Sequence, residues 1–396
     1  MTHLMSHLTT NSSLYIGVMT GTSLDGLDAV LADFSVPNRP HILAHTSIDY
    51  PLDLRLEMLA LQASSDGTGI NELHRSRIAA IALSDLHIQA LQQLLRKASI
   101  DSQHVAAIGV HGQTVRHLPQ GVCDKYSTAY TIQLLEPTRI AEALQCIVVS
   151  DFRARDIAAG GQGAPLVPAF HASLSADITK PIAFVNIGGF ANVTLLNPLK
   201  NPLNITSIQG FDTGPGNVLM DGWIQKHLNQ VYDSDGTWAA SGQIHRGLLL
   251  CLQSHPYFLQ PAPKSTGREV FNINWLESIL NRDEYLCQKL SPADVQATLC
   301  ELTAITIAQA VNQYSPECSH LLVCGGGAYN HHLMQRLSSY VPCDVATTEI
   351  IGIAPQQMEA LAFAWLARQC MLGLPANLPM VTGAAGLRVL GSICPA

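Results

Sequence analysis

YIGVMTGTSLDGLD, residues 15–28, places two strand-like runs on either side of a glycine-bounded turn. Residues 15–19 alternate β-forming and small side chains, and an apolar run resumes at Leu27, so the stretch predicts a β-hairpin. The turn brings two hydroxyls and a carboxylate, and its glycines let the backbone approach a ligand closely and point N–H groups at it. Such a turn suits a phosphate with its Mg²⁺, although an ordinary polar turn explains the same residues. The residues concerned are Gly21, Thr22, Ser23, Leu24, Asp25, Gly26, Leu27 and Asp28.

Composition limits the class of protein. A chain of 396 residues is longer than one hydrophobic core usually serves, so we expect two domains. Hydrophobic residues make up 47% of the chain, yet no window holds about 18 uninterrupted apolar residues, which predicts a soluble protein without a membrane span. Residues 1–14 are polar and lack Lys and Arg, so we expect a short disordered tail and no secretory signal.

Cysteine spacing and charge exclude several partners. The ten cysteines include no Cys-x-x-Cys pair, which favours reduced thiols in the cytoplasm and argues against a zinc site. A net charge of −8 without a basic cluster offers no electrostatic basis for binding nucleic acid or an anionic membrane. A small-molecule ligand is therefore expected.

Polar residues follow two predicted buried strands in the first half of the chain. His111 comes directly after the strand at residues 105–110, where it is either a site residue or a buried histidine with satisfied hydrogen bonds. DFRARD and GGQGAP follow the strand at residues 146–150, and a charged run followed by a glycine loop that enters a helix predicts an anion-binding corner. A salt-bridged loop is the alternative. The residues singled out are Asp151, Arg153, Gln162 and Gly163.

The strand pattern then starts again. A strand at residues 182–187, a turn with Gly188, Gly189 and Asn192, a strand at residues 193–196 and another at residues 205–209 repeat the order of residues 15–49. We infer a distant internal duplication of one β-β-β-α unit. Two phosphate-gripping turns that face each other would clamp a nucleotide between two domains.

Three further sites come from the second half. Asp212, in GFDTGPGN, follows a strand among glycines, where a carboxylate can reach substrate or, alternatively, serve a turn or cap a helix. Gly325, Gly326 and Gly327 lie between a buried strand and a helix; we assign them to adenosine, a tight turn being the alternative. Glu359, in the first turn of a C-terminal helix, is either a partner of the helix dipole or a substrate contact.

The pattern excludes two common nucleotide folds. No Gly-x-x-x-x-Gly-Lys-[Ser/Thr] motif is present, which excludes a P-loop NTPase, and no strand-to-helix Gly-x-Gly-x-x-Gly unit opens the chain, which disfavours a dinucleotide enzyme. What remains is the superfamily of actin, sugar kinases and heat-shock chaperone ATPases, which grips phosphates with hairpin turns from duplicated domains.

Several blocks resemble one family within that superfamily, the anhydro-N-acetylmuramic acid kinases. The blocks are GTSLDGLD, GVHGQTVRH, DFRARDIAAGGQGAPLVPAFH, VNIGGFANVT, GFDTGPGNVLMD, KSTGRE, VCGGGAYN and GIAPQQMEALAFAWLA. The resemblance implies that ATP, water and 1,6-anhydro-N-acetylmuramic acid become N-acetylmuramic acid 6-phosphate and ADP during cell-wall recycling. It makes Asp212 the base that deprotonates the water, residues 21–28 the phosphate loop and Glu359 a sugar contact, with Mg²⁺ ligands unknown.

The expected architecture is α/β, with two duplicated actin-like, ribonuclease H-like domains and an active-site cleft between them. Domain I should comprise residues 15–164 plus 377–396, and domain II residues 165–376. The resemblance also implies a cytoplasmic homodimer. Two alternatives remain open: an ordinary N-acetylhexosamine kinase on the same fold, and a non-catalytic ATP-driven switch.

Overall fold

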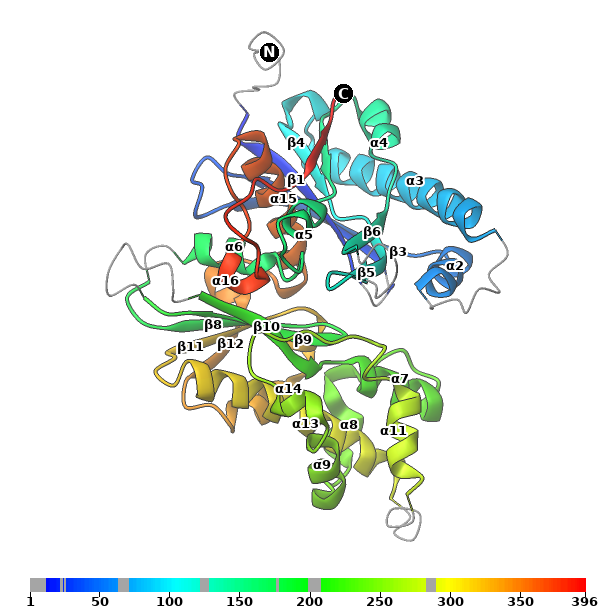
Figure 1. Ribbon diagram of the computed structural model, residues 1–396, viewed down its shortest axis with the longest axis vertical. Helices are drawn as coiled ribbons and strands as arrows, with labels where there is room; N and C mark the ends of the chain where they lie inside the picture. Colours follow the sequence, from blue (N-terminus) through cyan, green and yellow to red (C-terminus); the bar gives the residue numbers. More distant parts are fainter. Residues whose placement is uncertain are drawn as a thin grey trace. The chain divides into compact units, whose positions relative to one another are not determined.

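A computed structural model describes residues 12–21, 24, 26–62, 71–121, 128–175, 178–198, 208–282 and 290–396. The chain divides into two compact units (Figure 1). Unit 1 comprises Met1–Ala176 and Gln357–Ala396, and unit 2 comprises Asp177–Gln356. Each unit carries one main β-sheet with helices.

The main sheet of unit 1 has the strand order β13-β7-β4-β1-β2-β3. Its strands are β1 (Leu14–Thr20), β2 (Gly26–Asp33), β3 (His41–Asp49), β4 (Ala107–Val110), β7 (Val148–Ser150) and β13 (Ser392–Cys394). β1, β2 and β3 form an antiparallel meander, while β1, β4 and β7 run parallel. Because β1 already begins at Leu14 and the Phe34 N–H donates to the Ser13 carbonyl (2.9 Å), the predicted tail to residue 14 was too long.

Helices cover both faces of this sheet. The remaining elements of unit 1 are α2 (Leu52–Gln62), α3 (Glu72–Ala98), β5 (Gln113–Leu118), β6 (Tyr130–Leu134), α4 (Pro137–Leu144), α5 (Ala154–Ala158), α6 (Val167–Leu174), α15 (Met358–Met371) and α16 (Pro379–Thr382). α3 is long and apolar enough to cross a membrane by length and composition, but 56% of its apolar window is buried. Its Leu83, Leu91 and Leu94 share a core with Ile16 and Val18 of β1, as expected for a core helix of a globular unit.

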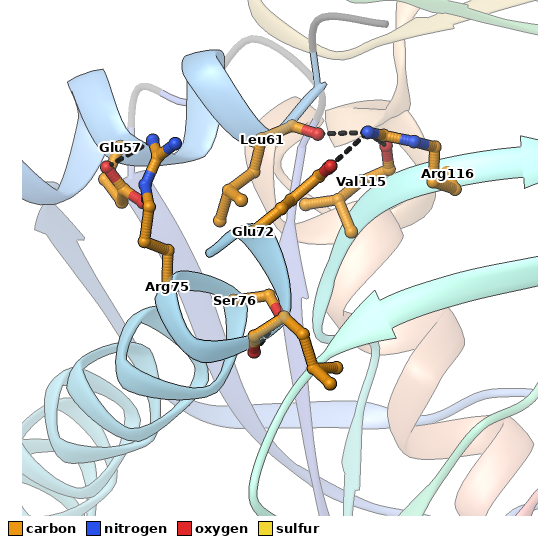
Figure 2. Close-up of polar contacts among 8 residues, drawn as sticks. Glu57, Leu61, Glu72, Arg75, Ser76, Val115 and Arg116 are labelled. Carbon is orange, nitrogen blue, oxygen red and sulfur yellow. Dashed lines mark hydrogen bonds and ion pairs between the residues drawn. The ribbon is translucent and has the colours of Figure 1, made fainter. Parts of the chain in front are cut away.

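Arg116, in the GVHGQTVRH block, has a structural role (Figure 2). Its guanidinium donates to the Leu61 carbonyl at the end of α2 and pairs with Glu72 at the start of α3. A second ion pair joins the same two helices, with Arg75 Nε 2.8 Å from Glu57 Oε1. These contacts fix α2 and α3 against the β5–β6 ribbon, and Arg116 is consequently not a free cation for a ligand.

α15 lies in a notch made by two glycines. Gly17 of β1 and Gly109 of β4 are paired across the sheet. A Cβ on Gly17 would lie 1.9 Å from the Ala360 carbonyl oxygen, and one on Gly109 would lie 2.2 Å from that of Phe363. The helix can approach this closely only because both side chains are absent. α15 therefore belongs to unit 1, whereas the sequence analysis placed residues 165–376 in domain II.

Unit 2 repeats the sheet of unit 1. Its strand order is β10-β9-β8-β11-β12. The strands are β8 (Ile182–Ile187), β9 (Phe190–Leu196), β10 (Ile208–Pro215), β11 (His320–Cys324) and β12 (Asp344–Thr347). β8, β9 and β10 form an antiparallel meander, and β8, β11 and β12 run parallel, as β1, β2, β3, β4 and β7 do in unit 1. The identical order and directions confirm the predicted α/β fold with a duplicated unit.

The core of unit 2 lies between its sheet and a layer of helices. The helices are α7 (Val218–Leu228), α8 (Thr237–Ser241), α9 (Arg246–Gln253), α10 (Pro256–Leu259), α11 (Ile273–Leu280), α13 (Pro292–Tyr314) and α14 (His331–Ser338). Val185, Val193 and Phe211, which are cross-strand neighbours, are fully or almost fully buried in this core with Leu299 of α13. Because side chains alternate along a strand, the residues next to this row face the other side of the sheet.

Candidate active site

Asp212 lies inside β10, beside a β-bulge. The prediction placed it after a strand, but β10 continues from Ile208 to Pro215. Asp212 pairs with Asn192, and the next pair in the ladder is Gly214 with Ala191, so Thr213 is the extra residue of the bulge. Bulges occur next to active sites, where they redirect a side chain out of the regular pleat.

Within the described residues, the Asp212 carboxylate is held through one oxygen. Its Oδ2 accepts a hydrogen bond from the Thr266 N–H (3.0 Å), and its backbone N–H donates to the Lys264 carbonyl (3.0 Å). Burial raises the pKa of Asp212 to about 7; the Thr266 N–H opposes the shift, and the negative charge of Glu269 adds to it. A carboxylate that titrates near neutral pH and has one oxygen tethered suits a general base.

The loop that carries these partners rests on an aromatic cluster. The Tyr257 hydroxyl donates to the Asp212 carbonyl (2.6 Å), and Lys264 Nζ lies 4.7 Å from the centroid of the Tyr257 ring. Phe258 stacks on Phe271, with ring centroids 5.4 Å apart. A Cβ on Gly214, whose φ is +148°, would lie 2.8 Å from Phe258 Cε1. The KSTGRE block is thus fixed against β10 by packing as well as by hydrogen bonds.

Two glycine turns of unit 2 meet at Asn217, which the sequence analysis did not single out. Its N–H donates to the Gly188 carbonyl (2.8 Å) and its side-chain amide to the Ile187 carbonyl (3.3 Å). A Cβ on Gly326 would lie 3.9 Å from the same amide. GPGN ends at this asparagine, so the motif itself held the signal, but the contact between distant turns did not follow from it.

The glycines differ in what they are needed for. A Cβ on Gly325 would lie 2.2 Å from Asn186 Oδ1, and one on Gly327 would lie 2.3 Å from Ile187 Cγ2, so packing against β8 requires both. Gly188, Gly189 and Gly326 have no atom closer than 3.7 Å to the Cβ position. This open space over bare backbone fits the approach of a nucleotide. Among Gly325, Gly326 and Gly327, Gly326 is the most exposed.

In unit 1 the predicted anion-binding corner is held by its own groups. Arg153 donates from Nε to His111 Nε2 (3.0 Å) and from Nη1 to the Gly163 carbonyl (2.7 Å). Burial lowers the pKa of Arg153 to about 10, against the opposing attraction of Glu359 and Asp156. Burial, reinforced by Arg153, holds the pKa of His111 well below its usual range, so His111 is neutral and accepts from the guanidinium. The structure thus brings Arg153 and Gly163 together, with the charge of Glu359 near enough to act on the pKa of Arg153.

Asp156, which the sequence analysis passed over, joins the C-terminal segment to this corner. Its carboxylate is fully buried and accepts from the Asn377 amide, the Thr382 hydroxyl and the Gly163 N–H, each at 2.8 Å. The Gln162 N–H donates to the Thr382 carbonyl (2.7 Å). These bonds explain why residues 377–396 belong to unit 1. They also give the Gly163 N–H a structural role.

Asp151 differs from its neighbours in exposure. It follows β7 with a φ of +55°, a left-handed conformation that is strained for a residue other than glycine. Its side chain is exposed, and partial burial of the carboxyl raises its pKa. Strain of this kind is concentrated at functional sites, and the contact of Asp151 with a ligand stays a prediction.

The predicted phosphate loop is only partly within the described residues. Thr22, Ser23 and Asp25 lie outside them. Leu24 is buried with a φ of +60°, and the Gly21 carbonyl accepts from the Leu24 N–H (3.3 Å) and from the buried Gln113 amide (3.3 Å). A Cβ on Gly26 would lie 2.4 Å from the Ile48 carbonyl oxygen, so packing on β3 requires this glycine.

Leu27 and Asp28, the last predicted members of the loop, are in β2. Leu27 is fully buried, and the Asp28 carboxylate lies 3.0 Å from His45 Nε2. Among the residues that the structure describes, no group of three or more His, Cys, Asp or Glu could hold a metal ion. Mg²⁺ binds proteins through one or two carboxylates and keeps waters and phosphate oxygens as its other ligands, so it needs no such group.

Comparison with known proteins gives one family. The family model described as anhydro-N-acetylmuramic acid kinase matches residues 13–396. The proteins of that name from Albidiferax ferrireducens and Variovorax paradoxus are 47% and 48% identical to this chain. The alignments cover 97% of this chain in both cases, and 100% and 99% of the relatives. The protein of that name from Thiobacillus denitrificans is 49% identical over 96% of this chain and 97% of its own length.

Proposed function

Because the chain belongs to the anhydro-N-acetylmuramic acid kinase family, we propose that it is an ATP-dependent kinase of 1,6-anhydro-N-acetylmuramic acid. It opens the 1,6-anhydro bridge with water and phosphorylates O6, giving N-acetylmuramic acid 6-phosphate and ADP. The observation that carries this proposal is the Asp212 carboxylate, which has one oxygen tethered by the Thr266 N–H and a pKa raised to about 7.

A single base, Asp212, serves both the opening of the anhydro bridge and the phosphorylation of O6. Water adds to C1, the bond from C1 to O6 breaks, and O6 takes the γ-phosphoryl group of ATP, while the proton of the water passes to Asp212. Transfer of the phosphoryl group draws electron density from O6, which makes the bridge oxygen a better leaving group at the moment of water attack. The raised pKa of Asp212 makes it a stronger base than an ordinary carboxylate and still leaves it ionised above neutral pH.

The proposal assigns separate tasks to the two units. In unit 1, residues 21–28 form the phosphate loop, and the sugar is contacted by Glu359, Asp151, Arg153, Gln162 and Gly163. In unit 2, Gly188, Gly189 and Gly325–Gly327 accommodate the nucleotide, and Gly188, Gly189 and Gly326 have the open space for it. Mg²⁺, bound with ATP, would neutralise charge on the transferring phosphoryl group.

The biological setting follows the substrate. An anhydro amino sugar of this kind comes from the turnover of peptidoglycan, so we place the enzyme in cell-wall recycling. We also propose a cytoplasmic homodimer, which the scattered cysteines without a Cys-x-x-Cys pair support as far as the compartment is concerned.

Coupled measurement of ADP release, with and without the anhydro sugar, tests the proposal. We expect release that depends on the anhydro sugar. An ordinary N-acetylhexosamine kinase would instead accept N-acetylmuramic acid and leave the anhydro sugar untouched. An ATP-driven switch would show slow ADP release that no sugar changes.

Isotopic labelling tests the chemistry. The bridge occupies the β face of the sugar, so water must attack from the α face and the first product is the α-anomer. In ¹⁸O-water the label enters at C1 and not the phosphate. Proton NMR before mutarotation and mass spectrometry of quenched product would detect both. Label in the phosphate would indicate ATP hydrolysis, and an initial β-anomer would indicate a covalent glycosyl-enzyme intermediate.

A further inference from the structure

Three polar residues form one row across the sheet of unit 2. Asn186 of β8 pairs with Asn192 of β9, and Asn192 pairs with Asp212 of β10. Directly paired residues project from the same face, with Cβ atoms about 4.5–5.5 Å apart. The adjacent row, Val185, Val193 and Phe211, is buried in the core, so the polar row lies on the opposite face.

The members of this row do not satisfy one another. Asn186 is 7% exposed, and its buried Oδ1 has no hydrogen-bond partner in the part of the chain that the structure describes. Asn192 is partly exposed, and its carboxamide makes no hydrogen bond to any residue that the structure describes. Asp212 uses Oδ2 for the Thr266 N–H, which leaves Oδ1 available. Polar neighbours that lie side by side without a direct hydrogen bond leave room for a bridging water or ligand group.

A fourth group completes the arrangement. Thr266 holds Asp212 through its backbone, and its buried hydroxyl also has no hydrogen-bond partner among the residues that the structure describes. Buried polar groups are nearly always paired, and leaving one unpaired costs about 1–3 kcal/mol. An unpaired hydroxyl on the residue that holds Asp212 indicates hydrogen-bonding capacity kept for a polar ligand rather than for the protein's own contacts.

We propose that Asn192 and Asp212 bind the same water, the one that adds to the anomeric carbon, and that Asn192 is a catalytic residue rather than a contact of the nucleotide. This inference rests on the proposed function. One hydrogen of the water is donated to Asp212 Oδ1 and the other to Asn192 Oδ1. With both hydrogens held, the lone pairs of the water oxygen are directed at the sugar. A base alone fixes only one of these two hydrogens.

The test compares Asn192→Ala and Asn192→Asp with Asn312→Asp. Asn312 is exposed on α13 and its amide donates to the Tyr340 carbonyl, so it gives the same charge change elsewhere in unit 2. Asn192→Ala should lower kcat about 10- to 100-fold, the cost of one lost hydrogen bond to a reacting group, with KM for ATP within twofold of the parent.

Asn192→Asp keeps the acceptor and the shape but places a like charge beside Asp212. The acid limb of kcat/KM should move to higher pH by about one unit, since two close carboxylates resist ionising together. The other charged or titratable groups around Asp212, namely Glu269, Tyr257 and Lys264, are unchanged in every variant. Asn312→Asp should leave the limb in place.

Two results would overturn the inference. A higher KM for ATP with unchanged kcat in Asn192→Ala would return Asn192 to the nucleotide turn. An unmoved acid limb in Asn192→Asp would show that residue 192 does not face the carboxylate. Titration of the Asp212 carboxyl by ¹³C NMR reads the same shift without turnover. It separates this inference from the proposed function, which fails if the parent enzyme does not release ADP with the anhydro sugar.

Discussion

The two units use their buried polar groups in opposite ways. In unit 1, Arg153 is held by His111 and the Gly163 carbonyl, and Asp156 accepts hydrogen bonds from three partners. In unit 2, Asp212 has one oxygen held, and Asn186 Oδ1 and Thr266 Oγ1 are buried without partners among the described residues. The first arrangement satisfies its buried groups within the unit, whereas the second leaves hydrogen-bonding capacity that we propose serves a substrate.

The difference has an energetic reason. A buried charge with satisfied hydrogen bonds orders the loops around it, while a carboxylate kept without full compensation destabilises the folded state and gains reactivity. Asp156 and Asp212 are therefore two aspartates of the same fold with separate roles. Substitution should affect unfolding at the first and turnover at the second.

Asp212→Asn is expected to have the largest effect. Turnover should fall by about 10²–10⁴ or more, the range for loss of a positioned base, while ATP and sugar binding change little. Because the folded-state pKa of Asp212 is raised to about 7 from 3.8, its ionisation lowers stability as pH rises from about 4 to 7, and the loss persists above pH 7.

The amide variant removes that penalty. At pH 8 its melting temperature should be higher than that of the parent by about 2–6 °C. Steady-state assays measure the turnover, and calorimetry on the same preparation measures the melting temperature. Turnover within threefold of the parent would remove Asp212 from the mechanism.

Asp156→Asn should lower stability and leave turnover nearly unchanged, the reverse of what we expect for Asp212→Asn. An amide cannot accept on its nitrogen, so at least one of the partners Gly163, Asn377 and Thr382 loses its hydrogen bond inside the protein. The unfolding free energy should fall by about 2–4 kcal/mol, measured by urea denaturation, with turnover per folded molecule within threefold of the parent. Asp101→Asn, at an exposed position of unit 1, is the control and should change stability by less than about 0.5 kcal/mol. Equal losses in both variants would contradict a special role for Asp156.

A pair of glycines sharpens the comparison at the predicted nucleotide turns. Gly26→Ala should lower the unfolding free energy by about 1–3 kcal/mol because its Cβ would lie 2.4 Å from the Ile48 carbonyl oxygen. Gly326→Ala has open space, so its stability should stay within about 0.5 kcal/mol of the parent while KM for ATP rises several-fold. Unchanged ATP affinity in Gly326→Ala would make that turn purely structural.

Part of the fold could be predicted from the sequence, and part could not. Strand periodicity and the repeated strand, turn, strand order predicted the duplicated sheets, because alternation and glycine turns are local signals. The notch of Gly17 and Gly109 was not predicted, since it depends on two strands meeting a helix from the far end of the chain. That long-range contact is the reason that the predicted boundary at residues 376/377 differs from the boundary of the units.

The candidate site likewise combines a motif that is visible in the sequence with contacts that depend on strand register. GFDTGPGN identified Asp212 because a carboxylate among glycines is visible in the sequence. The bulge at Thr213, the Thr266 N–H and the Asn186–Asn192–Asp212 row follow from strand register, which one sequence does not specify. Asn192 was accordingly assigned to the nucleotide turn by proximity in sequence, although it pairs with the proposed base.

The smallest expected effect concerns Glu269, whose negative charge acts on the pKa of Asp212. Glu269 raises the pKa of Asp212, so Glu269→Gln should lower the midpoint of the acid limb of kcat/KM, by less than about one unit because the interaction is secondary to burial. Asp212 must be ionised to accept the proton of the water, so the variant should retain more of its activity than the parent between about pH 6 and 7. Glu317→Gln, at an exposed position of unit 2, removes the same charge and should leave the profile unchanged. A midpoint that rises, or that moves equally in both variants, would mean that the acid limb reports a group other than Asp212.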